Sequence, residues 1–385
     1  MSPPWQIGTP LGSVLACIFV VHIAERHGRR ETVVTLGCAA ALWAALQALT
    51  RGANLRFPFV LASFAACLGF SSLLVLFLQT LRSSGEEHNK LRKTFLVGAL
   101  FPLLWVAVGI ALRMLVSYRP FINDPFLYAF DNTLGFQPSF VLGQLLQQHR
   151  FWLHITAFSY EGVVIPVAIL YAFHRLQPKI NVRLVPLWVT VIAGGYFIYY
   201  LFPAIGPIYA FDKLYPWHVV GSSLPLQPVW SASAAPRNCV PSIHYSLALL
   251  VWWNSRGRRW WARVLAWVFV AVMAVATLGL GEHYLADLVV AVPFSLAFQA
   301  LWTASPPIYR PERYTAILAP AAIFCTWLVL LRFEPLLFQR TPLFSWACIG
   351  FTILLCFALN YRLAHAPRPA VNCPPLRAAS SAPLS

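Results

Sequence analysis

Residues 94–118 read TFLVGALFPLLWVAVGIALRMLVSY, and this stretch decides the fold. It contains one arginine and no acidic residue. A run of about 20 such residues is long enough to cross the hydrocarbon core of a bilayer as an α-helix. A helix is expected because lipid offers no hydrogen-bond partners to unpaired backbone groups. The stretch therefore predicts a membrane-spanning helix.

The rest of the chain has the same apolar character. Of its 385 residues, 59% are hydrophobic and 10% are charged, whereas a soluble domain usually carries about 25% charged residues. Similar apolar runs predict spans near residues 10–24, 33–50, 57–81, 94–118, 151–173, 184–203, 243–254, 260–279, 285–304, 315–331 and 342–361. The sequence thus predicts an all-α, polytopic transmembrane helical bundle of about 10–11 spans.

Positive charge is unevenly divided between the two sets of alternate loops. Of the 28 Lys and Arg residues, 19 lie in the set that begins with loop 25–32, 8 lie in the other set, and Arg113 lies within a span. Positive residues mark the cytoplasmic side, so the first set is expected inside and the N-terminus outside. This topology accounts for the net charge of +16, and no nucleic-acid partner is expected. The expected location is an integral protein of the cell or inner membrane.

Four regions are expected along the chain. Residues 1–93 are N-terminal transmembrane helices of unknown role, and the charged loop RSSGEEHNKLRK (82–93) ends them. Residues 94–305 have long outward loops, where membrane enzymes build sites because water and protein can satisfy irregular backbone. Residues 306–363 are C-terminal transmembrane helices, and 364–385 are a disordered, Pro- and Ala-rich tail. Within the second region, 138–149 has apolar residues at helical spacing and is expected to lie flat on the interface.

The first candidate cluster is PRNCVPSIHY, residues 236–245, where a long outer loop meets the next helix. Pro241 and Ser242 are good helix-start residues, so free backbone N–H groups are expected to point outward. Such N–H groups and the positive end of the helix dipole form an anion site. Arg237 could add a bidentate grip on phosphate, and His244 could give a proton to a leaving group. The alternative is an ordinary helix cap with an interfacial histidine.

The second candidate cluster is TLGLGEHYLAD, residues 277–287. His283 and Asp287 are spaced i, i+4, which places them on one face of a helix. A carboxylate there fixes the imidazole tautomer and leaves the other nitrogen free to attack. The alternative is a satisfied polar pair, but an acid within an apolar run is a functional hypothesis by default.

The two histidines are expected at one mouth of the bundle. The basic-residue count places both on the non-cytoplasmic face, at the ends of successive antiparallel helices. One imidazole could attack phosphorus while the other protonates the departing oxygen. The cysteines show no metal-ligand spacing and no acidic cluster appears nearby, so we expect neither a metal nor a cofactor.

With these motifs, the sequence resembles the type-2 phosphatidic acid phosphatase superfamily, and within it the inositol phosphorylceramide synthase-like (inositolphosphotransferase) branch. The resemblance rests on LFPAIGPIYAF (201–211), PRNCVPSIH (236–244) and GEHYLAD (281–287), in the family's order. It covers roughly residues 95–305. It implies a six-helix phosphatase-like catalytic core in region 94–305. It further implies that His283 is the nucleophile, Asp287 its orienting carboxylate and His244 the general acid.

Two positions depart from the phosphatase branch of that family. Ile243 stands where that branch has glycine, and Thr277 stands where it has arginine. The branch's Lys/Arg motif ahead of PSxH also has no clear match. The candidates for holding the phosphate are Ser242, Arg237, Thr277, Lys213 and Arg119.

The resemblance implies an integral membrane phosphotransferase that acts on a lipid phosphate or phosphodiester through a phosphohistidine. The expected partners are a membrane lipid substrate and the bilayer, and the oligomeric state is open. The substitutions at Ile243 and Thr277 favour the transferase over the first alternative, a lipid phosphate phosphatase. The second alternative is a non-catalytic transporter or scaffold, because fold alone does not fix function.

Overall fold

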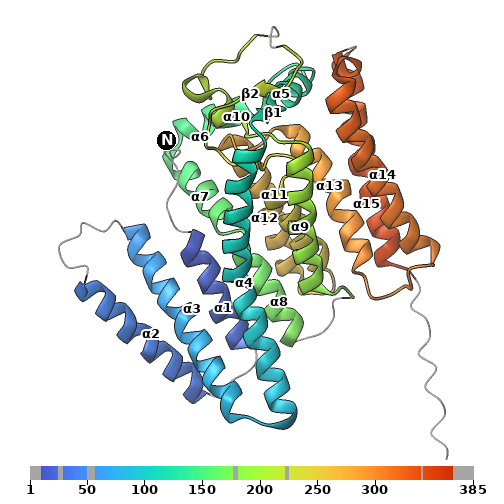
Figure 1. Cartoon of the computed structure of the whole chain (residues 1–385). Coiled ribbons are helices and arrows are strands. Elements are labelled where there is room, and N and C mark those ends of the chain that lie inside the picture. The colour runs from blue at the N-terminus through green and yellow to red at the C-terminus, as the bar shows by residue number, and fades with distance from the viewer. Residues whose placement is uncertain are drawn as a thin grey trace, which may run out of the picture.

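The computed structural model describes residues 10–24, 29–49, 57–176, 181–221, 225–339 and 341–366. Within these ranges the chain forms fifteen α-helices and one two-stranded sheet (Figure 1). The predicted all-α fold is confirmed. Expectations for the first nine residues and for the tail from residue 367 lie outside the described residues.

Twelve helices build the bundle. They are α1 (Pro10–Ala24), α2 (Arg29–Leu49), α3 (Phe57–Arg82), α4 (Gly85–Tyr118), α7 (Arg150–Glu161), α8 (Val164–Leu176), α9 (Leu184–Leu201), α11 (Ile243–Asn254), α12 (Trp260–Gly279), α13 (Leu285–Leu301), α14 (Pro311–Phe333) and α15 (Pro342–Ala364). The shorter elements are β1 (Phe121–Ile122), α5 (Asp124–Asn132), α6 (Pro138–Gln148), α10 (Pro207–Ala210), η1 (Asp212–Leu214), β2 (Val229–Trp230) and η2 (Pro335–Gln339).

Eight of the described helices are long and apolar enough to cross a membrane. The pair α7 and α8, bent by 54°, counts as a ninth span if the two are taken together. The helices α1 and α11 have 15 and 12 residues, which is shorter than the roughly 20 residues of a full span. The described chain is thus a polytopic helical protein whose composition is that of an integral membrane protein.

Helix α13 lies at the centre of the bundle. It packs against α9, α11, α14 and α15, and 72% of its apolar window is buried, a larger share than in any other candidate span of the described residues. The helices α1 to α3 lie on one side of this core and α14 with α15 on the other (Figure 1). Since α13 begins two residues after His283, the most buried helix also carries the second candidate cluster.

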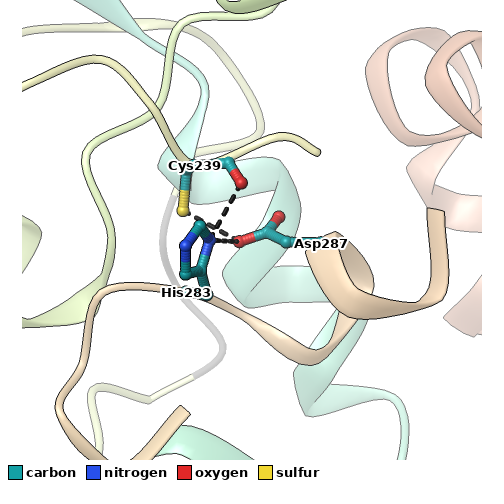
Figure 2. Close-up of side chains that lie close together, drawn as sticks. All are labelled: Cys239, His283 and Asp287. Atoms are coloured by element: carbon teal, nitrogen blue, oxygen red, sulfur yellow. Dashed lines mark hydrogen bonds and ion pairs between the residues drawn. The ribbon is translucent and has the colours of Figure 1, made fainter. Parts of the chain in front are cut away.

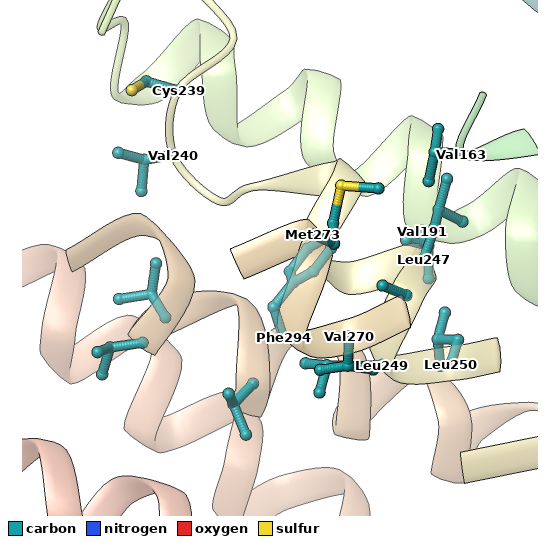
Figure 3. Close-up of a cluster of buried hydrophobic side chains, with 14 of the residues drawn as sticks. Val163, Val191, Cys239, Val240, Leu247, Leu249, Leu250, Val270, Met273 and Phe294 are labelled. Carbon is teal, nitrogen blue, oxygen red and sulfur yellow. The ribbon is translucent and has the colours of Figure 1, made fainter. Parts of the chain in front are cut away.

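The hydrophobic core reaches the loop that precedes α11. Leu249 and Leu250 of α11, Met273 of α12 and Val240 of the loop are fully buried in one cluster (Figure 3). Burying such side chains contributes about 1.5–3 kcal/mol each. The loop that leads into the first candidate cluster is therefore anchored to the core rather than lying over it.

The short elements gather at the end of the bundle where α11 and α13 begin (Figure 1). The strands β1 and β2 pair antiparallel there. Helix α6 confirms the predicted helix in segment 138–149, and it packs against α12 and α7. Its Ser139 hydroxyl donates to the carbonyl of His283 at 2.9 Å. These elements form a shell around the candidate site.

Candidate active site

His283 lies in the turn between α12 and α13, and its ring is held through Nδ1. Its backbone N–H donates to the carbonyl of Thr277 at 3.1 Å, which fixes the turn. Nδ1 lies 2.9 Å from the backbone carbonyl of Cys239 and 3.3 Å from Oδ2 of Asp287. A carbonyl only accepts hydrogen bonds, so Nδ1 carries the proton. Nε2 of the neutral ring therefore has a free lone pair.

Nε2 of His283 is buried and has no hydrogen-bond partner among the described residues. The side chain is 1% exposed, and burial lowers the pKa of His283 to about 3. The ring is therefore neutral at physiological pH. A buried polar atom without a partner costs about 1–3 kcal/mol, so such an atom indicates a catalytic or ligand-binding role.

Asp287 and Cys239 complete a compact group around this ring (Figure 2). Oδ2 of Asp287 accepts the Cys239 thiol at 2.8 Å and the backbone N–H of Tyr284 at 2.8 Å. In the second bond, Asp287 in the first turn of α13 caps the start of that helix. Asp287 thus both orients the histidine and fixes the turn that precedes α13. The distance in sequence from Cys239 to His283 and Asp287 matches no known motif, so the sequence alone did not predict its place in the site.

The same three side chains offer metal-ligand atoms. Cys239, His283 and Asp287 each contribute one atom, and these atoms lie within 4.8 Å of one another. Thiolate, imidazole and carboxylate are the ligand types of zinc. In this arrangement the atoms hydrogen-bond to one another, so a metal there would compete with the bonds that orient His283.

His244 lies in the first turn of α11, across from His283. The two ring centroids are 6.5 Å apart. The N–H of Ser242 donates to the carbonyl of Asp287 at 3.4 Å, so the starts of α11 and α13 are adjacent. The ring of His244 stacks on Tyr160 at 3.9 Å between centroids, with an interplanar angle of 17°. Tyr160 thus sets the plane of His244.

Two buried carboxylates of α5, Asp131 and Asp124, bind the segments that carry the site. Asp131 accepts the N–H groups of Leu285 and Ala286 at 2.8 and 3.2 Å, and so caps the start of α13. Asp124 accepts the N–H of Gly206 at 2.9 Å and the hydroxyl of Tyr284 at 3.1 Å. Burial raises the pKa of Asp131 to about 8 and that of Asp124 to about 6.

Gly206, in the stretch LFPAIGPIYAF, is required by a close approach. Its φ is +86°, and a Cβ there would collide with the carbonyl oxygen of Glu282. Left-handed backbone is favourable for glycine and costs other residues energy. This glycine lets the 201–211 stretch pack directly on the turn that carries the second candidate cluster.

Two of the predicted phosphate-binding residues, Arg237 and Ser242, bind the protein's own backbone. The buried guanidinium of Arg237 donates to the carbonyls of Arg119, Ser231, Ser233 and Ala235. Four of its five N–H donors are thus committed to the loop. Ser242 caps α11, where its hydroxyl accepts the N–H of Tyr245.

The other three candidates do not converge on the histidines through their side chains. Thr277 is fully buried and its hydroxyl donates to Met273 of its own helix at 2.9 Å. Arg119 stacks its guanidinium on Tyr200 at 4.8 Å. Lys213 is exposed in η1. None of these three lines the cavity that reaches His244, within the part of the chain the structure describes.

That cavity has a volume of about 490 Å³. His244, Glu282 and Asn238 are polar residues of its lining, while most of the other lining residues are apolar or aromatic. Its lining comprises Val14, Phe101, Leu104, Trp105, Val108, Leu112, Tyr160, Glu161, Val163, Val164, Val167, Ile192, Tyr196, Tyr199, Tyr209, Pro236, Asn238, Ile243, His244 and Glu282.

The fold and the site together define a class: a polytopic helical membrane protein with a buried His–Asp–Cys group facing a second histidine. A family model described as the PAP2 superfamily matches residues 125–301. This stretch contains both candidate clusters, and the match supports a phosphatase or phosphotransferase type of function. No curated protein and no solved structure matches the chain.

Proposed function

We propose that this protein is an integral membrane phosphotransferase that acts on lipid phosphodiesters through a phosphohistidine, in the manner of the inositol phosphorylceramide synthase-like branch. The observation that carries the proposal is the lone pair of His283 Nε2. It is buried and unpartnered among the described residues, while the Cys239 carbonyl holds the proton on Nδ1. This is the state that a nitrogen nucleophile requires.

The chemistry proceeds in two balanced steps. Nε2 of His283 bonds to phosphorus as the bond from phosphorus to the leaving oxygen breaks, and protonated His244 gives that oxygen its proton. An incoming alcohol then attacks phosphorus, the P–N bond breaks, and His244 takes the alcohol's proton. Reacting atoms lie about 3–3.5 Å apart and the acid lies ~2.6–3.2 Å from its oxygen. Taken together, these two distances come to about 6 Å. The imidazole centroids lie 6.5 Å apart, which is close to that length.

The cavity supports a lipid as the substrate. Five of its lining residues, at positions 101, 104, 105, 108 and 112, follow one face of α4. All five are apolar or aromatic, and His244 lines the same cavity. An acyl chain could lie along α4 while the phosphate reaches His244, whose ring faces His283. Region 94–305 would then be the catalytic core, with its site on the non-cytoplasmic face and no metal required.

A matched variant tests the enzyme proposal. In His283→Asn the amide can keep the bond to the Cys239 carbonyl, but no nucleophilic nitrogen remains. Purified wild-type protein should turn over a radiolabelled phospholipid, and this variant should not. Equal turnover by both proteins would reject His283 as the nucleophile. Absence of turnover by the wild type with every phospholipid tried would favour a transporter or scaffold.

The acceptor separates the two enzymatic alternatives. Labelled phospholipid is incubated with and without an added lipid alcohol. The transferase proposal expects label on the added alcohol, while water-soluble phosphate as the sole product would favour a phosphatase.

A topology reporter tests the membrane orientation. A reporter fused after Arg259 should read cytoplasmic, and an external signal would place the site on the other face.

A further inference from the structure

Among the described residues, the lining of the cavity contains acids, tyrosines and His244 but no lysine or arginine. Among the described residues that line it, Glu161 and Glu282 are acidic, and none is lysine or arginine. The candidate basic residues Arg237, Lys213 and Arg119 lie outside this lining. The side chains that most often bind an anionic headgroup, lysine and arginine, are therefore missing from the described lining.

Of the two acids among the described residues that line the cavity, Glu282 is the one next to the proposed nucleophile in the sequence. It precedes His283 directly, and it is 5% exposed. Its Oε1 accepts the hydroxyl of Tyr209 at 3.0 Å, and its side chain lines the cavity. A carboxylate in a largely buried wall is costly unless donors or a cation compensate its charge, so this wall is suited to a ligand that brings positive charge.

Four tyrosine rings share this lining with Glu282. Tyr160, Tyr196, Tyr199 and Tyr209 all contribute to its wall, and Tyr196 and Tyr199 meet edge to face at 5.5 Å. Tyrosine faces attract cations within about 6 Å, and aromatic cages recognise quaternary ammonium groups in this way. A carboxylate beside tyrosine rings is thus suited to an ammonium group.

We infer that the lipid substrate carries an ammonium headgroup, as in a zwitterionic aminoalcohol phospholipid, and that Glu282 and the surrounding tyrosines bind this group. The inference rests on the proposed function for the position of the phosphate between His244 and His283. The phosphoryl chemistry would be that of the inositol phosphorylceramide synthase-like branch, but the headgroup would differ from inositol. The substrate's own cation would balance the Glu282 carboxylate. Its acyl chains would follow the apolar face of α4.

A binding experiment on the full-length His283→Asn variant separates this inference from catalysis. Short-chain phosphatidylcholine, phosphatidylinositol and phosphatidic acid are titrated into the protein in a non-ionic detergent and followed by calorimetry. Phosphatidylcholine should bind most tightly. Phosphatidylinositol or phosphatidic acid binding as tightly or more tightly would overturn the inference, whether or not the wild-type protein turns over any lipid.

A second substitution identifies the carboxylate. Adding Glu282→Gln should weaken phosphatidylcholine binding by about 10- to 100-fold, the loss expected for a hydrogen bond to a charged group. The same change should leave phosphatidic acid binding equal or stronger, because it removes a negative charge. Glu334→Gln, outside the cavity lining, is the matched control and should change neither.

Tyr209→Phe is the control that separates loss of the Glu282 charge from a structural disturbance of the cavity. This change removes the hydroxyl that binds Glu282 but leaves the carboxylate charged, so the preference for phosphatidylcholine should persist. Equal loss of all three lipids in Glu282→Gln, with an unchanged melting temperature, would show that Glu282 does not read the headgroup charge.

Discussion

Asp287→Asn is the substitution whose effect follows most directly from the geometry. The asparagine carbonyl can still accept the N–H of Tyr284, which lies 2.8 Å from Oδ2 in the native site. The Nδ1 proton of His283 keeps its closer partner, the Cys239 carbonyl at 2.9 Å. The reactive tautomer should therefore survive, while the 3.3 Å bond from Nδ1 loses its charged acceptor.

The magnitude follows from that single bond. A hydrogen bond to a charged group is worth about 1.5–3 kcal/mol, which corresponds to a roughly 10- to 150-fold loss of turnover. If the aspartate alone fixed the tautomer, its replacement would cost ~10⁴-fold, as in sites that depend on one carboxylate.

The assay is the initial rate of phospholipid turnover by purified Asp287→Asn and wild-type protein in the same detergent, with melting temperatures measured in parallel. We expect a loss of about 10- to 150-fold, as worked out from the hydrogen bond, and little change in melting temperature. A loss near four orders of magnitude in a stable protein would refute the role given to the Cys239 carbonyl.

Three further predictions concern stability and pH. Asp131→Ala removes the acceptor of two buried N–H groups at the start of α13, and should lower the free energy of unfolding by about 2–4 kcal/mol, measured by thermal denaturation. Arg237→Ala should act mainly on stability, because its guanidinium binds four loop carbonyls; a variant with native stability but weakened phosphate affinity would contradict this. Burial raises the pKa of Glu282 to about 7, so its carboxylate is charged above that pH and protonated below it. Phosphatidylcholine binding should strengthen as pH rises through about 7, and Glu282→Gln should reduce this change, which separates Glu282 from Glu161, His244 and the tyrosines that share the cavity.

The helices were predictable because the membrane constrains them. Apolar runs such as 94–118 must form helices where lipid cannot satisfy the backbone, and α4 covers that whole run. The spacing of His283 and Asp287 also predicted their contact, although the physical reason differs from a shared helix face. His283 lies in the turn before α13, and Asp287 reaches back to it from the first turn of that helix. Local sequence therefore predicted the elements and one contact of the site.

Contacts between distant segments were not predictable in this way. The carbonyl that holds His283 belongs to Cys239, 44 positions earlier, and the ring that stacks on His244 belongs to Tyr160. Neither has a spacing that links it to its partner. Arg237 shows the converse: its charge suggested a phosphate ligand, but the folded loop supplies carbonyls that occupy most of its donors.

The most direct test of the central claim is to trap the intermediate. Purified wild-type protein and His283→Asn are incubated briefly with a phospholipid that carries radioactive phosphorus, denatured in alkali and separated from lipid. We predict protein-bound label that is stable to alkali and lost in acid, as a phosphorus–nitrogen bond requires, and that maps to His283. Substrate turnover without such label, or equal label on His283→Asn, would contradict the account.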